Sequence, residues 1–277
     1  MTNLKPLVKW VGGKRQLLPH IHAALPATGY STYFEPFFGG GAVLWSLAPH
    51  KAVVNDLNAE LINLYAVVRD NVEGLIAELQ DYPNDEEFFY QLRALDRDAE
   101  VFAQLSPVKR AARTVYLNKT CYNGLYRVNL AGQFNSPFGR YKKPLICDVK
   151  TLHAVHAYLN DNDVTFLQGD FKDAVKTARP GDFVYFDPPY DPVNITSNFV
   201  GYAAGGFGRA QQVELKELCD ELSARGINWM LSNSATDFIR DLYADYHVDI
   251  VGASRAINSV ASKRGKVDEV LVRNYDR

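Results

Sequence analysis

The sequence has few cysteines and no long hydrophobic run. Its three cysteines, Cys121, Cys147 and Cys219, lie far apart, with no CxxC pair and no clustered histidine partner. We therefore expect no disulfide framework, no zinc site and no other metal. No stretch is apolar enough to cross a bilayer, and the first residues, MTNLKPLVKWVGGKR, lack the apolar block of a signal peptide. We expect a cytoplasmic protein without a membrane partner.

Acidic residues are missing from one long segment. The 47 residues between Glu100 and Asp148 contain no Asp or Glu, although the formal net charge of the whole chain is −2. Even spacing of the acids would place about five there. A solvated basic face is one explanation, but the interleaved Tyr, Phe, Asn and Gly residues favour a surface that binds a polyanion. The basic residues of this segment are Lys109, Arg110, Arg113, Lys119, Arg127, Arg140, Lys142 and Lys143.

Short strand-like runs alternate with helix-like segments over much of the chain. This alternation predicts an α/β fold with a mostly parallel sheet and helices on its faces. Two further runs, 246–255 and 269–275, have the pattern of a hairpin, which predicts an antiparallel edge. The other strand-like runs, which end in polar or glycine-rich corners, are 32–37, 51–56, 163–170, 182–190 and 227–233.

Residues 57–155 interrupt the alternation. They begin with an amphipathic helix candidate, LNAELINLYAVVRD, continue through further helical stretches and end in the basic segment. We therefore predict a sheet domain formed by residues 1–56 and 156–277, with a mainly helical domain, 57–155, inserted into it.

Three strand ends carry residues suited to a nucleoside. In YFEPFFGGGAVLW, the glycines Gly39–Gly41 allow a tight turn and close approach of a ligand to the backbone. Leu44 stands where a dinucleotide fingerprint would have its third glycine, which argues against that kind of site. Asp56 could accept hydrogen bonds from ribose, and Asp170-Phe171 offers an acceptor and a flat apolar wall for a purine. Helix caps and core packing are the simpler role for each residue alone, but together they predict one pocket.

The fourth strand end has a distinct chemistry. In FVYFDPPYDPV, an apolar run meets Asp187, Pro188, Pro189 and Tyr190. If Asp187 and the Pro188 carbonyl accept hydrogen bonds from an amino group, they localise the lone pair of its nitrogen, which can then attack an electrophile. The Tyr190 ring can stack on the base, which offsets part of the cost of removing that base from a duplex. This corner therefore indicates modification of a nucleobase amine.

Five motifs follow one another along the chain: KWVGGK (9–14), FEPFFGGGAV (34–43), ND (55–56), GDF (169–171) and DPPY (187–190). In this order they resemble the Dam-type DNA adenine-N6 methyltransferases (D12 class, alpha group), and in particular the subgroup from GATC restriction–modification systems. The resemblance implies a Rossmann-like seven-stranded mixed sheet of the S-adenosylmethionine-dependent methyltransferase fold. It also implies methyl transfer from S-adenosylmethionine to N6 of a flipped-out adenine in double-stranded DNA, within GATC. A cognate restriction endonuclease acting on the same site without direct contact is a further expectation.

The resemblance also assigns site residues. It implies that Asp187, Pro188 and Tyr190 are catalytic, with the inserted segment as the target-recognition domain. The methyl donor would contact Trp10, Gly12, Lys14, Phe34, Glu35, Phe38, Gly39, Gly41, Asp56, Asp170, Phe171 and Asp187. The residues expected to bind DNA are Lys9, Tyr122, Asn123, Leu125, Arg127, Pro137, Arg140, Tyr141 and Lys142. One departure is the doubled aromatic Phe37-Phe38, which we expect to alter packing only.

The same residues exclude one other activity and leave several alternatives open. A cytosine-C5 methyltransferase would need a nucleophilic cysteine after a proline, and no cysteine here has that context. Enzymes that methylate cytosine N4, RNA or protein glutamine use related corners and remain alternatives, as does a DNA-binding regulator without catalysis.

The loop at 191–210 is rich in Gly, Ser and Asn, so we expect it to be mobile. We also expect Arg255, Lys263 and Arg264 to add phosphate contacts.

Overall fold

A computed structural model of the chain describes residues 4–193, 206–254 and 266–276. Within these ranges one sheet has seven strands in the order β3-β2-β1-β4-β5-β7-β6. The first five are parallel, and β7 runs antiparallel to both of its neighbours. This confirms the predicted mixed α/β sheet and its antiparallel edge. The strands are β1 (Tyr33–Glu35), β2 (Lys51–Asp56), β3 (Asp163–Gln168), β4 (Phe183–Phe186), β5 (Asn228–Ser234), β6 (His247–Ser254) and β7 (Lys266–Arg273).

Both faces of the sheet are buried. Successive strand residues point to opposite faces, and Val184 and Tyr185 of β4 accordingly belong to two different hydrophobic clusters. Helix α10 (Arg209–Ala224) covers one face through Leu215 and Leu222, which recur at helical spacing. Helices α1 (Leu18–Ala23) and α2 (Ala42–Leu47) contribute to the other face. Two short helices, α9 (Phe171–Ala174) and α11 (Asp237–Leu242), follow β3 and β5.

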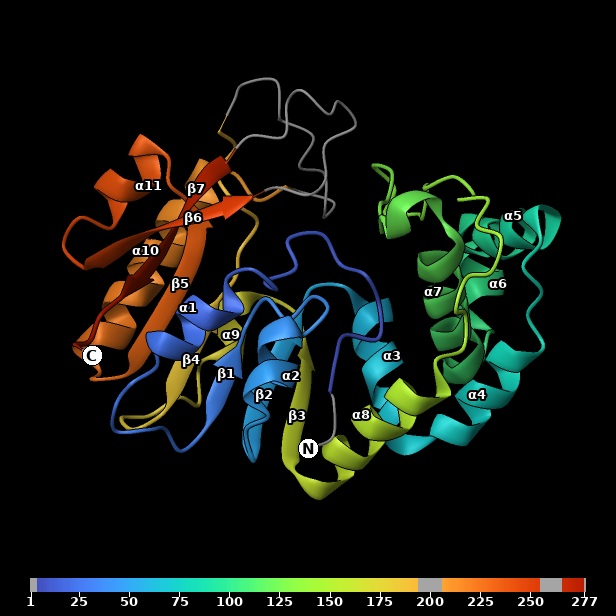
Figure 1. The fold of residues 1–277 in the computed structure, drawn as a ribbon, viewed down its shortest axis with the longest axis horizontal. Coiled ribbons are helices and arrows are strands. Elements are labelled where there is room, and N and C mark those ends of the chain that lie inside the picture. The colour runs from blue at the N-terminus through green and yellow to red at the C-terminus, as the bar shows by residue number, and fades with distance from the viewer. Residues whose placement is uncertain (1–3, 194–205, 255–265, 277) are drawn as a thin grey trace.

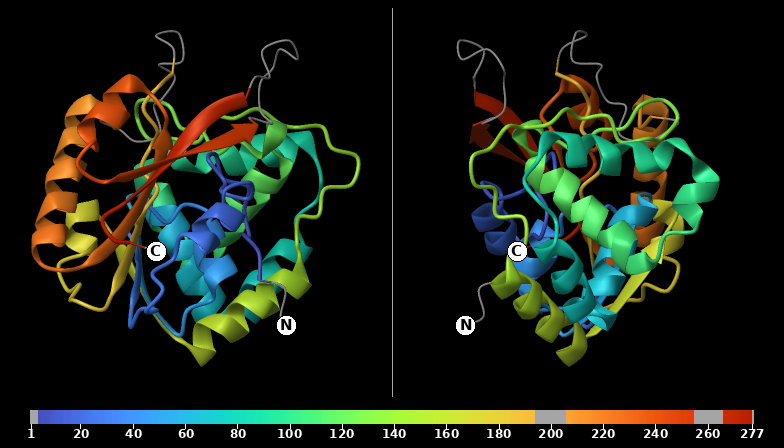
Figure 2. Two further views of the ribbon diagram at one scale, coloured as in Figure 1. Left: turned by 60° about the vertical axis from the view of Figure 1, so that its left-hand side comes forward. Right: turned by 90° about the vertical axis from the view of Figure 1, so that its right-hand side faces the viewer.

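Helices connect β2 to β3. Figure 1 shows α10 and the group α4–α7 at opposite ends of the molecule, and in the right-hand view of Figure 2 the teal and green helices face the viewer with the orange α10 behind them. Residues from α3, α4, α7 and α8 share a hydrophobic cluster with residues of the sheet. Residue 155, the predicted end of the inserted domain, lies inside helix α8. The division into two domains stays a prediction. The helices are α3 (Ala59–Asp70), α4 (Val72–Gln80), α5 (Glu86–Ala94), α6 (Ala99–Ala103), α7 (Pro107–Thr120) and α8 (Val149–Asp161), with 3-10 turns η1 (Leu95–Arg97) and η2 (Tyr122–Gly124).

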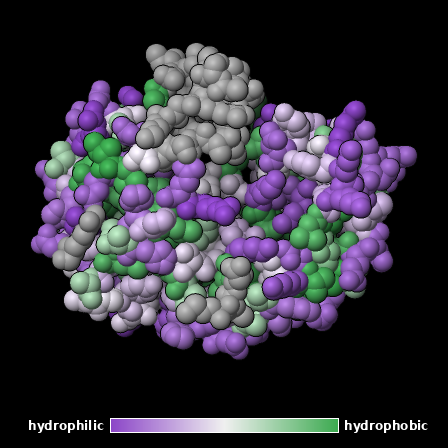
Figure 3. All heavy atoms as spheres, in the orientation of Figure 1, coloured by the Kyte–Doolittle hydropathy of each residue, from purple (hydrophilic) through white to green (hydrophobic). Residues whose placement is uncertain are grey.

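Hydrophilic side chains cover much of the face seen in Figure 3, over the sheet and over the helices that follow β2. Among the described residues, no helix is both long and apolar enough to cross a membrane. Much of the predicted mobile loop, together with Arg255, Lys263 and Arg264, lies outside the described residues.

Candidate active site

The corner after β4 brings several predicted residues together. Asp187 follows directly on the buried strand β4, at its carboxyl end. The Lys14 ammonium lies 2.5 Å from Asp187 Oδ1, and their side chains are 5% and 20% exposed. Lys14 Nζ also donates to the Gly12 carbonyl at 2.6 Å and lies 4.6 Å from the centre of the Tyr190 ring. The N-terminal segment therefore supplies a buried cation to the DPPY corner.

Two carboxyl groups near this cation have altered acidity. Burial raises the pKa of Asp187, while Lys14 and a hydrogen bond from Ser232 act in the opposite direction. Burial also raises the pKa of Glu35 well above its usual range, and the Asp187 charge adds to that effect. A hydrogen bond of 2.9 Å from the Tyr33 hydroxyl to Glu35 Oε2 opposes it. Both carboxyl groups therefore lie near the Lys14 charge, and Glu35 is enclosed in the protein interior at 2% exposure.

Two residues that contact this corner were not predicted from the sequence. Ser232 Oγ donates to Asp187 Oδ1 at 3.1 Å and lies 2.8 Å from the Tyr185 hydroxyl. The Tyr190 hydroxyl donates to Glu269 Oε2 of β7 at 3.2 Å. The polar end of the strand-like run at 227–233 was a usable signal for Ser232, because the carboxyl ends of parallel strands lie along one edge of a sheet.

The glycine corner is held by Asp56. Gly39 N donates to Asp56 Oδ2 at 2.8 Å, and Asn58 N donates to Oδ1 at 2.8 Å. Gly39 and Gly41 both have positive φ, +50° and +69°. A Cβ on Gly39 would lie 2.8 Å from Trp10 Cδ1. Asp56, predicted to contact ribose, thus also fixes a backbone turn that requires glycine.

Buried Asn55 ties the first and third strand ends together. Its Nδ2 donates to the carbonyls of Pro36 and Gly169, each at 3.0 Å. Asp170, which follows Gly169, is exposed and caps α9 by accepting from Lys172 N at 2.8 Å. Three of the predicted corners are therefore adjacent in space.

Aromatic side chains line the same region. Phe171 stacks on Phe37 with ring centroids 5.2 Å apart. Phe34 and Phe38, both assigned to the donor site, are buried at 2% exposure. Phe38 packs edge-on against Trp45 and Tyr65, so it contributes to the core here. Phe37, which we treated only as a departure in packing, is the half-buried ring of the pair.

The N-terminal segment also contacts α7 and the segment after it. Lys9 N donates to Asn118 Oδ1 at 2.8 Å, and Asn118 Nδ2 donates to the Lys9 carbonyl at 2.7 Å. The Trp10 ring stacks on Tyr126 at 4.8 Å, and Lys9 Nζ lies 5.8 Å from the centre of the Tyr141 ring. Trp10 therefore lies between the glycine corner and the residues predicted to bind DNA.

The predicted DNA-binding residues after α7 share one segment. Antiparallel bridges pair Cys121 with Phe138 and Val128 with Phe134, so residues 121–138 fold back on themselves. Leu125 and Tyr141 are half-buried. Arg127 Nε donates to Asn135 Oδ1 at 2.8 Å, and Arg140 Nη2 lies 3.4 Å from Glu86 Oε1. The exposed members are Tyr122, Asn123, Arg127, Pro137, Arg140 and Lys142.

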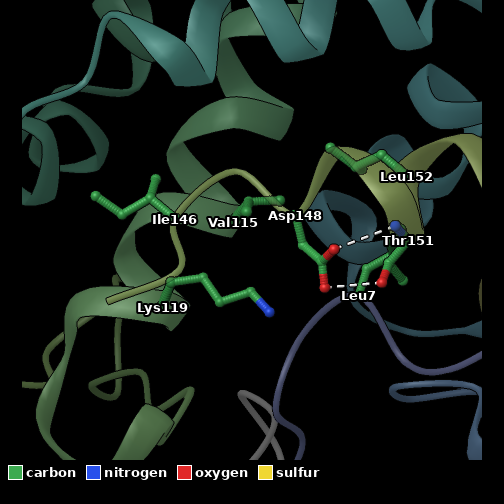
Figure 4. A pocket seen from close by; sticks show the side chains of 7 residues that line it. All are labelled: Leu7, Val115, Lys119, Ile146, Asp148, Thr151 and Leu152. Carbon is green, nitrogen blue, oxygen red and sulfur yellow. Dashed lines mark hydrogen bonds between the residues drawn. The ribbon is translucent and has the colours of Figure 1, made fainter. Parts of the chain in front are cut away.

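The basic segment is less available to a ligand than its sequence suggests. Arg113 is buried and pairs with Asp96 at 2.8 Å, and Arg110 pairs with Glu60. Figure 4 shows Lys119 extending into a small hollow that is also lined by Asp148, and burial lowers the pKa of Lys119. The helix α7 thus carries three of the eight charges inward or against acidic residues of other segments, and these three do not belong to the exposed basic surface.

Comparison with known proteins agrees with the motifs. A family described as D12 class N6 adenine-specific DNA methyltransferase matches residues 10–257. The chain is 46% identical to the type II methyltransferase M1.LlaDCHI of Lactococcus lactis subsp. cremoris, over 99% of this chain and 96% of that protein. It is 40% identical to M.MjaIII of Methanocaldococcus jannaschii, over 98% and 99% of the two chains. It is 34% identical to the DNA adenine methylase of Escherichia coli K12, over 98% and 95%. The chain therefore belongs to the D12 class of N6 adenine-specific DNA methyltransferases.

Proposed function

We propose that the protein transfers the methyl group of S-adenosylmethionine to N6 of an adenine that has been flipped out of double-stranded DNA, within the sequence GATC. The contacts of Asp187 carry this proposal. Among the described residues, two side chains bind the Asp187 carboxylate, through Lys14 Nζ and Ser232 Oγ, and both contact its Oδ1. Oδ2 is therefore the oxygen that can accept a hydrogen bond from the target amine.

The chemistry follows from where the acceptors lie. Asp187 Oδ2 and the Pro188 carbonyl hold the two amine hydrogens and localise the lone pair on N6, while the Tyr190 ring stacks on the base. Positioning is the main catalytic device. As N6 forms its new bond, positive charge develops on it, and the Asp187 carboxylate stabilises that charge. When bound, S-adenosylmethionine would supply a methyl group on a positively charged sulfur. The sulfur–methyl bond breaks as N6 bonds to the methyl carbon, the sulfur leaves as the neutral thioether of S-adenosylhomocysteine, and N6 releases one of its two hydrogens as a proton.

The strand ends next to β4 suit a nucleoside donor. The left-handed glycine turn at the end of β1 packs against Trp10, and the exposed Asp170 precedes Phe171, whose ring stacks on Phe37. Asp56 already accepts two amides, but each carboxylate oxygen can accept a second hydrogen bond. We assign Asp56 to the ribose, Asp170 and Phe171 to the adenine of the donor, and Trp10, Gly12 and Lys14 to the same pocket.

The exposed residues of 122–142 would contact DNA. The Arg127 guanidinium suits guanine O6 and N7, and Leu125 suits a thymine methyl. Lys142 and Arg140 would meet phosphates. Two of the relatives are named type II methyltransferases, which supports a restriction–modification role beside an endonuclease acting on the same sequence.

Replacement of Asp187 by Ala tests the proposal. We expect methyl transfer to duplex DNA to be abolished while the protein still folds, measured with tritiated S-adenosylmethionine and circular dichroism. The control is Asp237→Ala. Asp237 is exposed and forms an ion pair with Arg240 on the same helix turn. Transfer near the wild-type rate in Asp187→Ala would refute the assignment. Digestion of the product to nucleosides separates N6-methyladenine from N4-methylcytosine, and mapping of modified adenines tests GATC.

A further inference from the structure

A chain of buried amides holds the backbone on both sides of Tyr190. Gln212 Nε2 donates to the Pro189 carbonyl at 2.8 Å, and Gln212 Oε1 accepts from Asn233 Nδ2 at 3.1 Å. Asn233 Oδ1 in turn accepts from Asp191 N at 2.9 Å. Gln212 is 1% exposed and Asn233 is 0% exposed. The residues before and after Tyr190 are thus connected through two side chains from other elements.

Only one orientation of the two amide groups satisfies every contact. Asn233 Oδ1 also accepts from Ser234 N at 2.8 Å, so its oxygen must face the backbone amides and its NH2 group must face Gln212. Gln212 must then present oxygen to Asn233 and its own NH2 group to Pro189. Gln212 lies in the first turn of α10, and Asn233 lies near the end of β5. The direction of the Pro189 carbonyl is therefore set by rigid elements.

The corner itself offers few other ways to fix its backbone. Pro188 and Pro189 have no backbone N–H, so neither can donate a hydrogen bond. Beyond Tyr190, the Asp191 carboxylate accepts from Thr236 Oγ1 at 2.8 Å and pairs with Arg209 Nε at 3.2 Å. The Asp191 side of the corner is therefore held by several contacts. On the other side, among the described residues, the side chain that donates a hydrogen bond to the Pro189 carbonyl is that of Gln212.

We propose that Gln212 and Asn233 are positioning residues for methyl transfer. They touch neither the base nor the donor. By fixing the Pro189 carbonyl and the Asp191 amide, they aim the preceding Pro188 carbonyl and the Tyr190 ring at the target adenine. This inference rests on the proposed function of Asp187, Pro188 and Tyr190.

Gln212→Met tests the proposal, because it keeps the length of the side chain and removes both hydrogen bonds. We expect the single-turnover rate of transfer, with saturating DNA and S-adenosylmethionine, to fall about 100-fold, since small misplacement of reacting groups has effects of that order. Affinities for DNA and donor should stay within about twofold, because the pair contacts neither ligand. Gln211→Met on the same turn, where the half-buried side chain accepts from Gly208 N at 2.9 Å, should leave rate and affinities near wild type.

A second variant keeps the test decisive. Gln212→Glu retains an acceptor for Asn233 but loses the donor to Pro189, so its rate should fall in the same way. A rate within threefold of wild type in both folded variants would overturn the proposal. So would an equal loss of rate and affinity, or failure of both variants to fold, since each would indicate a structural role. Transfer by Asp187→Ala would instead refute the proposed function itself.

Discussion

Lys14 and Asp187 form a largely buried ion pair of 2.5 Å between the N-terminal segment and the corner after β4. The same ammonium lies against the face of the Tyr190 ring at 4.6 Å. A cation near a buried carboxylate favours its charged form. Lys14 therefore helps Asp187 to remain ionised although burial raises its pKa.

Removal of Lys14 should move the acidic limb of the pH–rate profile. Transfer needs ionised Asp187, so activity falls as pH drops through its pKa, which burial places above the usual 3.8. Lys14→Met removes the charge that opposes this shift, so the limb should move to higher pH. Single-turnover rates at saturating donor and DNA measure it. Arg15→Met, at the exposed neighbouring position, should leave the limb in place, and the same result for Lys14→Met would contradict the ion-pair argument.

Gly39→Ala should destabilise the protein and weaken donor binding. Alanine at φ +50° costs about 1–2 kcal/mol, and its Cβ would additionally lie 2.8 Å from Trp10 Cδ1. Gly132→Ala provides the backbone strain alone, since at φ +76° its Cβ would meet nothing within 4 Å. Urea unfolding and calorimetric titration with S-adenosylmethionine make the comparison. Equal losses in the two variants would show that Trp10 does not press on this turn.

Glu35 should make stability depend on pH. Its folded-state pKa is raised by burial, so its favourable contribution is complete below the unfolded pKa of about 4.3 and is lost as pH rises through the folded value. The free energy of unfolding of wild type should therefore fall relative to Glu35→Gln as pH rises from 4.5 toward 8 (about the working range of urea titrations). Glu217→Gln, at an exposed position, is the matched control. A flat difference for Glu35→Gln would mean that the buried carboxyl titrates normally.

Arg127→Ala should relax sequence choice, with about 1 to 3 kcal/mol of discrimination lost at one base pair. Its guanidinium is exposed and is held by Asn135 at 2.8 Å. Lys142→Ala is the matched change, and it should weaken binding to all sequences alike and reduce the salt dependence. Fluorescence anisotropy with GATC and single-base variants measures both. Uniform weakening by Arg127→Ala would remove its base-reading role.

The local pattern of the chain was enough to predict much of this protein. Apolar runs that end in GGG, ND, GDF and DPPY predicted the strands β1 to β4 and placed four chemical corners at their ends, because strand length and turn residues are set by short-range sterics. The hairpin pattern of 246–255 and 269–275 likewise predicted the antiparallel edge. These features need no knowledge of distant neighbours.

Tertiary structure decided which side chains meet at those corners. Three contacts depend on strand order and register: Ser232 with Asp187, Glu269 with the Tyr190 hydroxyl, and Gln212 with the Pro189 carbonyl. The inward turn of Arg113 toward Asp96 depends on how α7 packs. Such contacts join residues far apart along the chain, and the energy that selects them comes from the shared burial of many side chains at once, so no single motif encodes them.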